Sequence, residues 1–188
     1  MPYNPNLHHR RSIRLKGYDY SQAGAYFITI CCQDMKCLFG EVVMEEALNF
    51  NEIGNSDFIN AGASPAPTGA TMQLNVYGQI AHDEWNILSE RFLNVILDVF
   101  QIMPNHMHGI IVLKEQATIK IGDIIGAYKS LVAYKCLELF KLQNKIMGKL
   151  WQRNYYEHII RTEDAYENIS NYIINNPAKW CKDKFFIK

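Results

Sequence analysis

The sequence predicts an α+β fold in which helices pack on an antiparallel β-sheet. Two observations indicate this class. Apolar runs of strand length alternate irregularly with amphipathic runs of helical spacing, and several connections are short enough for hairpins. The chain has 188 residues, of which 48% are hydrophobic and 20% are charged, as in ordinary globular proteins. We therefore expect residues 1–188 to form a single domain with a substantial core.

Four apolar segments are predicted to be strands. They are residues 25–32, 95–103, 106–113 and 155–161. Pro104 and Asn105 form a turn that returns the second of these strands into the third. Residues 38–43 are expected to be the hairpin partner of the first strand.

Three segments have the pattern of amphipathic helices. Residues 78–92 carry apolar side chains at helical spacing, namely Ala81, Trp85, Leu88 and Phe92. Residues 121–140 repeat apolar side chains along one face, which predicts a helix packed on the core. The last helix is expected over residues 163–175, with Thr162 as its N-cap and Pro177 ending it.

Two segments are predicted to be irregular. Residues 54–71 are rich in Gly, Pro and small side chains, and a loop of this length in a compact domain is usually functional or disordered. Residues 1–24 form an arm without the apolar core of a signal peptide, and no apolar run approaches the roughly 20 residues that cross a bilayer. We expect a cytoplasmic protein with no membrane segment. The arm carries four clustered basic side chains: Arg10, Arg11, Arg14 and Lys16.

The charges balance overall but are unevenly distributed. Residues 1–40 have five basic and two acidic side chains, residues 41–100 have one and nine, and residues 101–188 have thirteen and eight. A neutral chain argues against a histone-like binder, although the basic flanks can form a local positive surface, with an ordinary mixed surface as the alternative. The five cysteines include no CxxC pair, so neither a disulfide framework nor a zinc ribbon is indicated.

His106 and His108 form the first candidate site. Side chains alternate across a strand, so residues two apart point to the same face, with Met107 on the opposite face. Two imidazoles placed side by side can share one metal ion. The alternative from spacing alone is a pair of half-buried, hydrogen-bonded histidines.

Tyr172 and Asn176 form the second candidate site. Residues four apart lie on one face of a helix, so the tyrosine hydroxyl and the amide oxygen are presented together. The spacing also fits a core tyrosine and a helix-end asparagine, and it does not decide between the two interpretations.

Four motifs together resemble the REP-associated and insertion-sequence tyrosine transposases of the HUH nuclease superfamily. They occur in that family's order over most of the chain: RRSIRLKGYDYSQAGAYFITI at 10–30, MPNHMHGIIV at 103–112, WQRNYYEHIIR at 151–161 and YIINNPAKW at 172–180. The resemblance implies a ferredoxin-like antiparallel sheet with helices packed on it. It also implies that the histidine motif lies on a central strand and the tyrosine on a helix packed against it.

The resemblance also implies an activity and its residues. His106, His108 and Asn176 would bind a divalent metal, Mg²⁺ or Mn²⁺, and Tyr172 would attack a DNA phosphodiester to give a 5′-phosphotyrosine and a free 3′-hydroxyl. Related insertion-sequence enzymes often have Gln where this chain has Asn176. The partner would be single-stranded or hairpin DNA, and the protein would be a monomer or a homodimer.

Contacts to DNA are expected from basic side chains, because binding of this anion is largely electrostatic. The candidates are Arg10, Arg11, Arg14, Lys16, Lys129, Arg153 and Arg161. Tyr155 and Tyr156 either stack on unpaired bases or pack in the core. Two other functions remain: a protein that binds hairpins without cutting them, and a small metallohydrolase, which would leave Tyr172 without a role.

Overall fold

The computed structural model describes residues 17–44, 69–114 and 119–186. Its centre is a four-stranded sheet in the order β4-β5-β1-β6, in which every neighbouring pair is antiparallel. The strands are β1 (Gly24–Cys31), β4 (Val95–Ile102), β5 (His106–Leu113) and β6 (Tyr156–Ile160). The predicted strands are thus confirmed, and the predicted histidine motif lies on β5, one of the two central strands.

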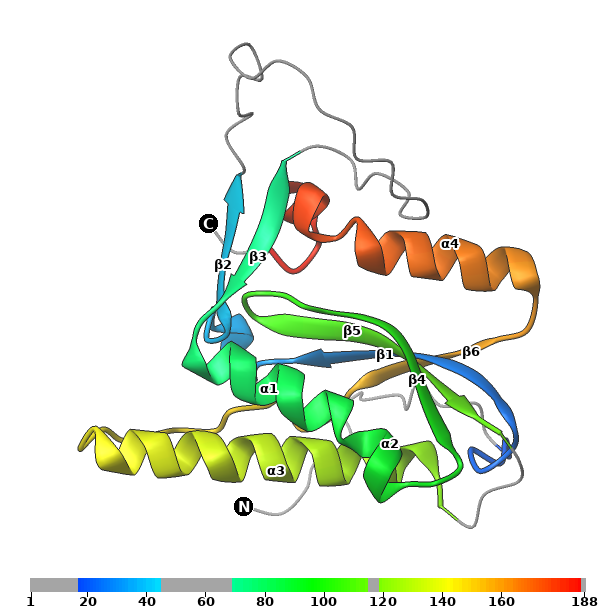
Figure 1. Cartoon of the computed structure of the whole chain (residues 1–188), viewed down its shortest axis with the longest axis horizontal. Coiled ribbons are helices and arrows are strands. Elements are labelled where there is room, and N and C mark those ends of the chain that lie inside the picture. Colours follow the sequence, from blue (N-terminus) through cyan, green and yellow to red (C-terminus); the bar gives the residue numbers. More distant parts are fainter. Residues whose placement is uncertain (1–16, 45–68, 115–118, 187–188) are drawn as a thin grey trace, which may run out of the picture.

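Helices connect these strands in the order of a ferredoxin-like fold. Between β1 and β4 the chain forms α1 (Val76–Asn86) and α2 (Leu88–Arg91), and between β5 and β6 it forms α3 (Ile121–Leu142). Figure 1 shows these three helices below the sheet and α4 (Glu163–Ile174) across its other face. The sequence-based expectation of an α+β fold with helices on an antiparallel sheet is confirmed.

The two faces of the sheet bury different sets of side chains. Met107, Ile111 and Leu113 of β5 join the main core, which lies between the sheet and α1 and α3. The alternate residue Ile110 joins a smaller cluster with Ile173 of α4. Because side chains alternate along a strand, His106 and His108 lie on the α4 side of the sheet with Ile110.

Gly109 allows α1 to approach β5 closely. A Cβ atom at this position would lie 2.5 Å from the Cζ2 atom of Trp85, whose side chain is fully buried. Trp85 in turn packs edge-on against Tyr128 of α3. The helix layer is therefore fixed against the strand that carries the histidines, on the opposite face.

Polar caps begin the helices near these elements. The Asn75 side chain accepts hydrogen bonds from the amides of Tyr77 and Gly78, so α1 begins two residues earlier than the predicted 78–92 helix. That predicted helix is also two elements, since the chain passes from α1 to α2 at Ile87. Thr162 caps α4 as predicted, accepting from the amide of Ala165.

Between β1 and α1 the structure differs from the predictions made for residues 38–43 and for the end of the 54–71 loop. Residues 38–43 are not the partner of β1, because β2 (Gly40–Met44) pairs with β3 (Ala70–Leu74) in a separate two-stranded sheet. Both long edges of β1 are already paired, with β5 and β6. The predicted 54–71 loop lies outside the described residues up to position 68, and Ala70 and Thr71 belong to β3.

No helix within the described residues is both long and apolar enough to cross a membrane.

Glu84 is fully buried in α1 and forms ion pairs with Lys135 of α3 and Arg91 of α2. These pairs connect the three helices that cover the main core.

Candidate active site

His106 and His108 lie side by side on β5, as the strand spacing predicts. Their Nε2 atoms are 3.1 Å apart, and the two rings are 0% and 1% exposed. In an octahedral site with metal-to-ligand distances of about 2.1 Å, two neighbouring ligand atoms lie about 3 Å apart. The separation of the two Nε2 atoms therefore fits two ligands of one metal ion.

Neighbouring side chains orient both imidazoles. Asn105 directs its amide nitrogen to the carbonyls of Met35 and Phe185, so its oxygen faces His106 Nδ1 at 2.8 Å. His106 therefore donates from Nδ1, and its Nε2 carries the free electron pair. Thr29 Oγ1 lies 2.8 Å from His108 Nδ1 and leaves Nε2 of that ring facing the same point. Such contacts behind the two imidazoles are typical of metal-binding histidines.

Burial keeps both rings neutral. Burial lowers the pKa of His106 to about 4, with the Asp183 carboxylate opposing this shift and Lys184 adding to it. Burial also lowers the pKa of His108 well below its ordinary value, with the charges of His106 and Lys184 adding to the shift. Neutral imidazole is the form that binds metal.

Tyr172 of α4 faces the histidine pair. Its hydroxyl lies 3.1 Å from His108 Nε2, and its ring packs edge-on against Phe27 of β1. Burial raises the pKa of Tyr172 to about 12, and the nearby Asp183 charge adds to this shift. The phenol is thus protonated near neutral pH and needs help to act as a nucleophile.

Asn176 lies one turn after Tyr172 and is almost fully buried. Its amide nitrogen donates to Asp183 Oδ2 at 2.8 Å, whereas its Oδ1 is buried with no hydrogen-bond partner among the described residues. A buried, unpaired carbonyl oxygen beside two neutral imidazoles is the donor that a divalent ion would satisfy. The residues present therefore fit a metal site.

Asp183 is the site residue that sequence reasoning missed. It follows η2 (Pro177–Lys182), a short 3₁₀ helix that turns the chain back toward the sheet after α4. Its carboxylate and the ring nitrogens of the two histidines all lie within 4.8 Å of one another. No strand or helix period links Asp183 to the other site residues. The only signal in the sequence is an acidic side chain among the lysines at 179–184.

The basic candidates within the described residues do not line this site. Arg10, Arg11, Arg14 and Lys16 lie outside the described residues. The Lys129 ammonium donates to the main-chain carbonyls of Gln152 and Arg153, so it supports the segment that leads into β6. Arg153 and Arg161 are exposed on either side of that strand. Tyr155 packs against the main core, whereas Tyr156 is 41% exposed.

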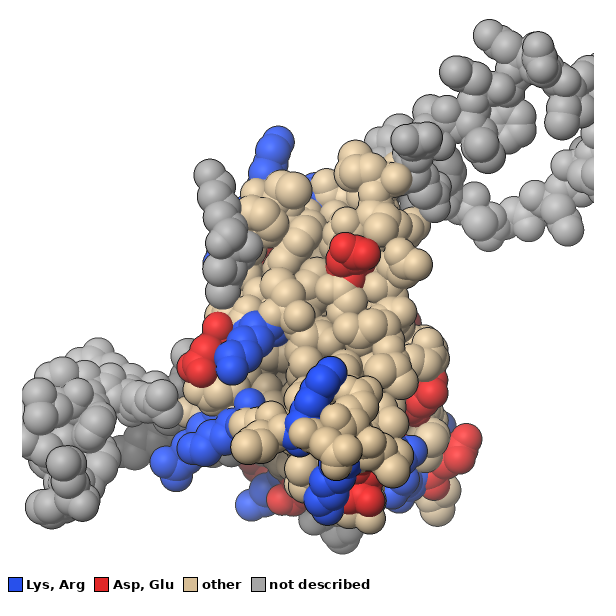
Figure 2. All heavy atoms as spheres, turned by 90° about the vertical axis from the view of Figure 1, so that its left-hand side faces the viewer, with Lys and Arg blue, Asp and Glu red and all other residues tan. Residues whose placement is uncertain are grey.

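Surface charge is mixed on the face shown in Figure 2. Lys and Arg side chains gather in the lower part of that view, where the C-terminal end of α3 faces the viewer, and Asp and Glu side chains lie among them. The central part of this face has few charged side chains. This face therefore does not form a uniformly basic surface of the kind that binds DNA.

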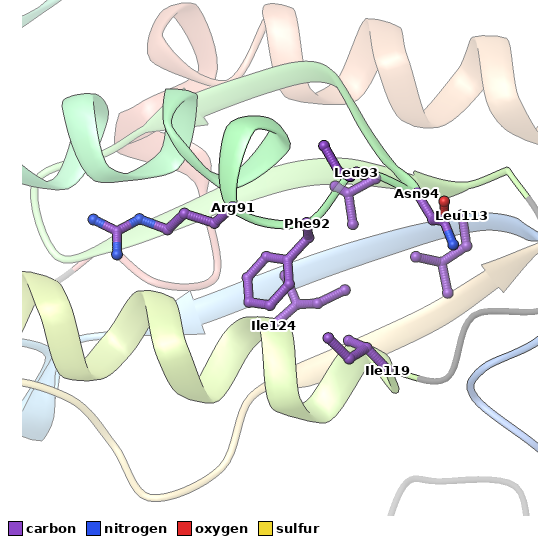
Figure 3. Close-up of a pocket in the computed structure, with 8 residues that line it drawn as sticks. Arg91, Phe92, Leu93, Asn94, Leu113, Ile119 and Ile124 are labelled. Carbon is purple, nitrogen blue, oxygen red and sulfur yellow. The ribbon is translucent and has the colours of Figure 1, made fainter.

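A second concave region lies away from the histidines. A pocket of about 250 Å³ is bordered by Phe92, Leu113, Ile119 and Ile124, beside α2 and the start of α3. Figure 3 shows mainly apolar side chains around it, with the Arg91 guanidinium extending away from the aromatic ring. It lacks the convergent polar groups of the histidine site, so we do not consider it the active site.

Comparisons with known proteins match the same region. The chain matches the model of the family described as "Transposase IS200 like" over residues 82–176, which include both histidines, Tyr172 and Asn176. An uncharacterized Haemophilus influenzae protein is 37% identical over 98% of this chain and 97% of its own length. Another protein from that organism, described as "Putative REP-associated tyrosine transposase", is 29% identical over 42% of this chain and 47% of its own.

A solved structure shares the fold. The structure of a REP-associated tyrosine transposase bound to a REP hairpin superimposes with a TM-score of 0.56 at 16% identity. The match covers 92% of this chain and 77% of the other. At this level of identity the similarity concerns the architecture described above.

Proposed function

The chain belongs to the IS200-like transposase family, and from that premise we propose that it is a metal-dependent transposase that cuts and rejoins single DNA strands through Tyr172. The observation that carries this proposal is the hydrogen-bond distance of 3.1 Å between the Tyr172 hydroxyl and His108 Nε2. It brings a potential nucleophile to a buried pair of neutral imidazoles. A small metallohydrolase that attacks with an activated water would not need a tyrosine nucleophile at this place.

His106, His108 and Asn176 are the proposed metal ligands. The histidines offer Nε2 electron pairs, and Asn176 offers its unpaired buried Oδ1. This mixed set of nitrogen and oxygen donors suits Mg²⁺ or Mn²⁺, with positions left for phosphate oxygens. When bound, the ion supplies Lewis-acid stabilisation of the charge that develops on the phosphate.

Tyr172 performs the substitution at phosphorus. Its hydroxyl oxygen forms the new bond to phosphorus, and the bond from phosphorus to the 3′-oxygen breaks. The 3′-oxygen takes up a proton from water, which leaves a 5′-phosphotyrosine and a 3′-hydroxyl. Asp183 is the proposed acceptor of the phenol proton, because its Oδ2 lies 3.4 Å from the Tyr172 oxygen. Attack of a 3′-hydroxyl on the phosphotyrosine reverses these changes and rejoins a strand, since one phosphodiester replaces another.

The proposed substrate is a single-stranded or hairpin DNA. Unpairing a duplex costs a few kcal/mol, which an already unpaired strand avoids. The basic arm with Arg10, Arg11, Arg14 and Lys16, together with Lys129, Arg153 and Arg161, remains the proposed source of phosphate contacts. We expect the protein to act in the cytoplasm as a monomer or a homodimer.

The test uses 3′-end-labelled hairpin DNA from the sequence that flanks the coding region, incubated with the full chain and Mg²⁺ or Mn²⁺. On a denaturing gel, the proposed enzyme gives label that migrates with the protein and a second fragment ending in a 3′-hydroxyl. A hydrolase would give two free fragments and no adduct. A protein that only binds hairpins would release uncut DNA on denaturation.

A further inference from the structure

A cavity of about 540 Å³ opens beside Tyr172. Phe27 and Tyr156 line it from the sheet, and Lys179, Lys182 and Lys184 line it from η2 and the residues that follow. Tyr172, Asn176 and Asp183 complete the lining, so the cavity is continuous with the candidate active site. β6, which carries Tyr156, is the outer strand of the four-stranded sheet, so the cavity lies at a sheet edge. Its volume is that of a site for a small organic group.

Aromatic rings form one wall of the cavity. Phe27 packs edge-on against Tyr156 on one side and against Tyr172 on the other, with centroids 6.2 Å apart in both pairs. It also stacks on His108 at 5.3 Å. Tyr156, by contrast, leaves 41% of its surface exposed. The exposed part of the Tyr156 ring, held in place by Phe27, is a platform on which a planar base can stack.

Cationic side chains form the other wall. Lys179, Lys182 and Lys184 are all exposed, and in the part of the chain that the structure describes none of them forms a salt bridge. The Lys184 ammonium lies 4.7 Å from the centre of the Phe185 ring. The Asp183 carboxylate lines the cavity as well, so three cations and one anion face the aromatic wall. The net positive charge and the aromatic rings suit a ligand that has both an anionic and a planar part.

We propose that this cavity binds one unpaired nucleotide next to the phosphate attacked by Tyr172. The base stacks on Tyr156 beside Phe27, and Lys179, Lys182 and Lys184 contact the adjoining phosphates. A base paired within a duplex is not free to enter, so the cavity selects an unpaired strand at the point of cleavage. This inference rests on the proposed function, because it places the nucleotide by reference to Tyr172.

The test measures equilibrium binding of fluorescently labelled DNA to the full chain without divalent metal, so that no cleavage is required. The probes are a single-stranded oligonucleotide of mixed sequence and an abasic oligomer of equal length. Tyr156→Ala is expected to weaken binding of the first probe by about fivefold or more, whereas Tyr156→Phe retains it. Binding of the abasic probe should be the same in both variants. Tyr134→Ala, which removes an exposed tyrosine from α3, is the matched control.

The lysines are tested by salt dependence. Replacing Lys179, Lys182 and Lys184 with Ala should flatten the slope of affinity against salt by about one unit for each phosphate that these side chains neutralise. The matched variant replaces Lys141, Lys145 and Lys149, which lie at and beyond the end of α3, and should keep the slope.

Three results would overturn the subsite: no binding of the mixed-sequence probe by the parent chain, equal binding by Tyr156→Ala, or an equal loss for the abasic probe. Failure of the parent chain to form a covalent adduct would refute the proposed function instead. Binding that depends on Tyr156 would survive that failure, so the two outcomes are distinguishable.

Discussion

The Tyr172 hydroxyl and the Asp183 carboxylate approach to 3.4 Å across eleven residues of chain. The negative charge adds to the burial that raises the pKa of Tyr172 to about 12, so both effects favour the protonated phenol. The same carboxylate is the proposed acceptor when that proton leaves. Asp183 therefore favours the protonated phenol and also lies close enough to take up its proton.

Asp183→Asn should slow adduct formation by about 100-fold or more, the usual contribution of a general base. The asparagine keeps the shape of the side chain, so the fold and DNA binding should be retained. Initial rates of adduct formation at saturating metal provide the measurement. Asp34→Asn, at an exposed position, is the control and should retain the parent rate. An unchanged rate in Asp183→Asn would exclude this residue as the proton acceptor.

Thr29→Val should weaken metal binding by about tenfold or more, because it removes the hydroxyl that lies 2.8 Å from His108 Nδ1. Thr29→Ser keeps the hydroxyl and should bind nearly as tightly as the parent chain. Calorimetric titration of each full-length variant with Mn²⁺ gives the dissociation constants. Equal constants for Val and Ser would show that Thr29 does not orient the ligand.

Stability of the metal-free protein should fall as the pH drops from about 6.5 to about 4. Burial lowers the pKa of His106 to about 4 from the ordinary value of 6.5, so between these values the unfolded chain binds a proton that the folded chain excludes. This contribution is complete above about pH 6.5 and is on the order of 3 kcal/mol. Denaturant unfolding across this range should show a shallower decline for His106→Gln. An equal decline in His106→Gln would contradict the assignment, and exposed His158→Gln is the control.

Gly109→Ala should destabilise the fold by about 1–3 kcal/mol, because the added methyl group meets the Trp85 ring. Gly126→Ala, in α3, meets no atom within 4 Å and should stabilise the helix by up to about 1 kcal/mol. Thermal or denaturant unfolding of the two variants measures the difference. A neutral Gly109→Ala would mean that α1 can retreat from β5 without cost.

The sequence predicted the parts of the site that depend on local periodicity. His106 and His108 share a face because strand side chains alternate, and the predicted strand has the same bounds as β5. Tyr172 and Asn176 share a helix face for the corresponding reason at a spacing of four. The ferredoxin-like strand order followed from the family resemblance, since no residue pattern specifies which strands pair.

The missed features depend on contacts between distant segments. Asp183 reaches the site only because η2 reverses the chain after α4. Residues 40–44 pair with 70–74 rather than with β1, whose two edges are occupied by strands that come much later in the sequence. Tyr155 packs against the core and Tyr156 is partly exposed, and only the structure shows which of these two neighbours faces the core.

The most direct test of the central claim is to map the residue that becomes linked to DNA. After cleavage of hairpin DNA with Mn²⁺, the account predicts a phosphotyrosine at position 172 by peptide mass mapping. Tyr172→Phe should bind DNA and metal but form no adduct, whatever the Mn²⁺ concentration. Tyr166→Phe, on the same helix, removes a hydroxyl that hydrogen-bonds Asp98 of β4 and should form the adduct normally. An adduct that persists in Tyr172→Phe, or that maps to another tyrosine, would contradict the account.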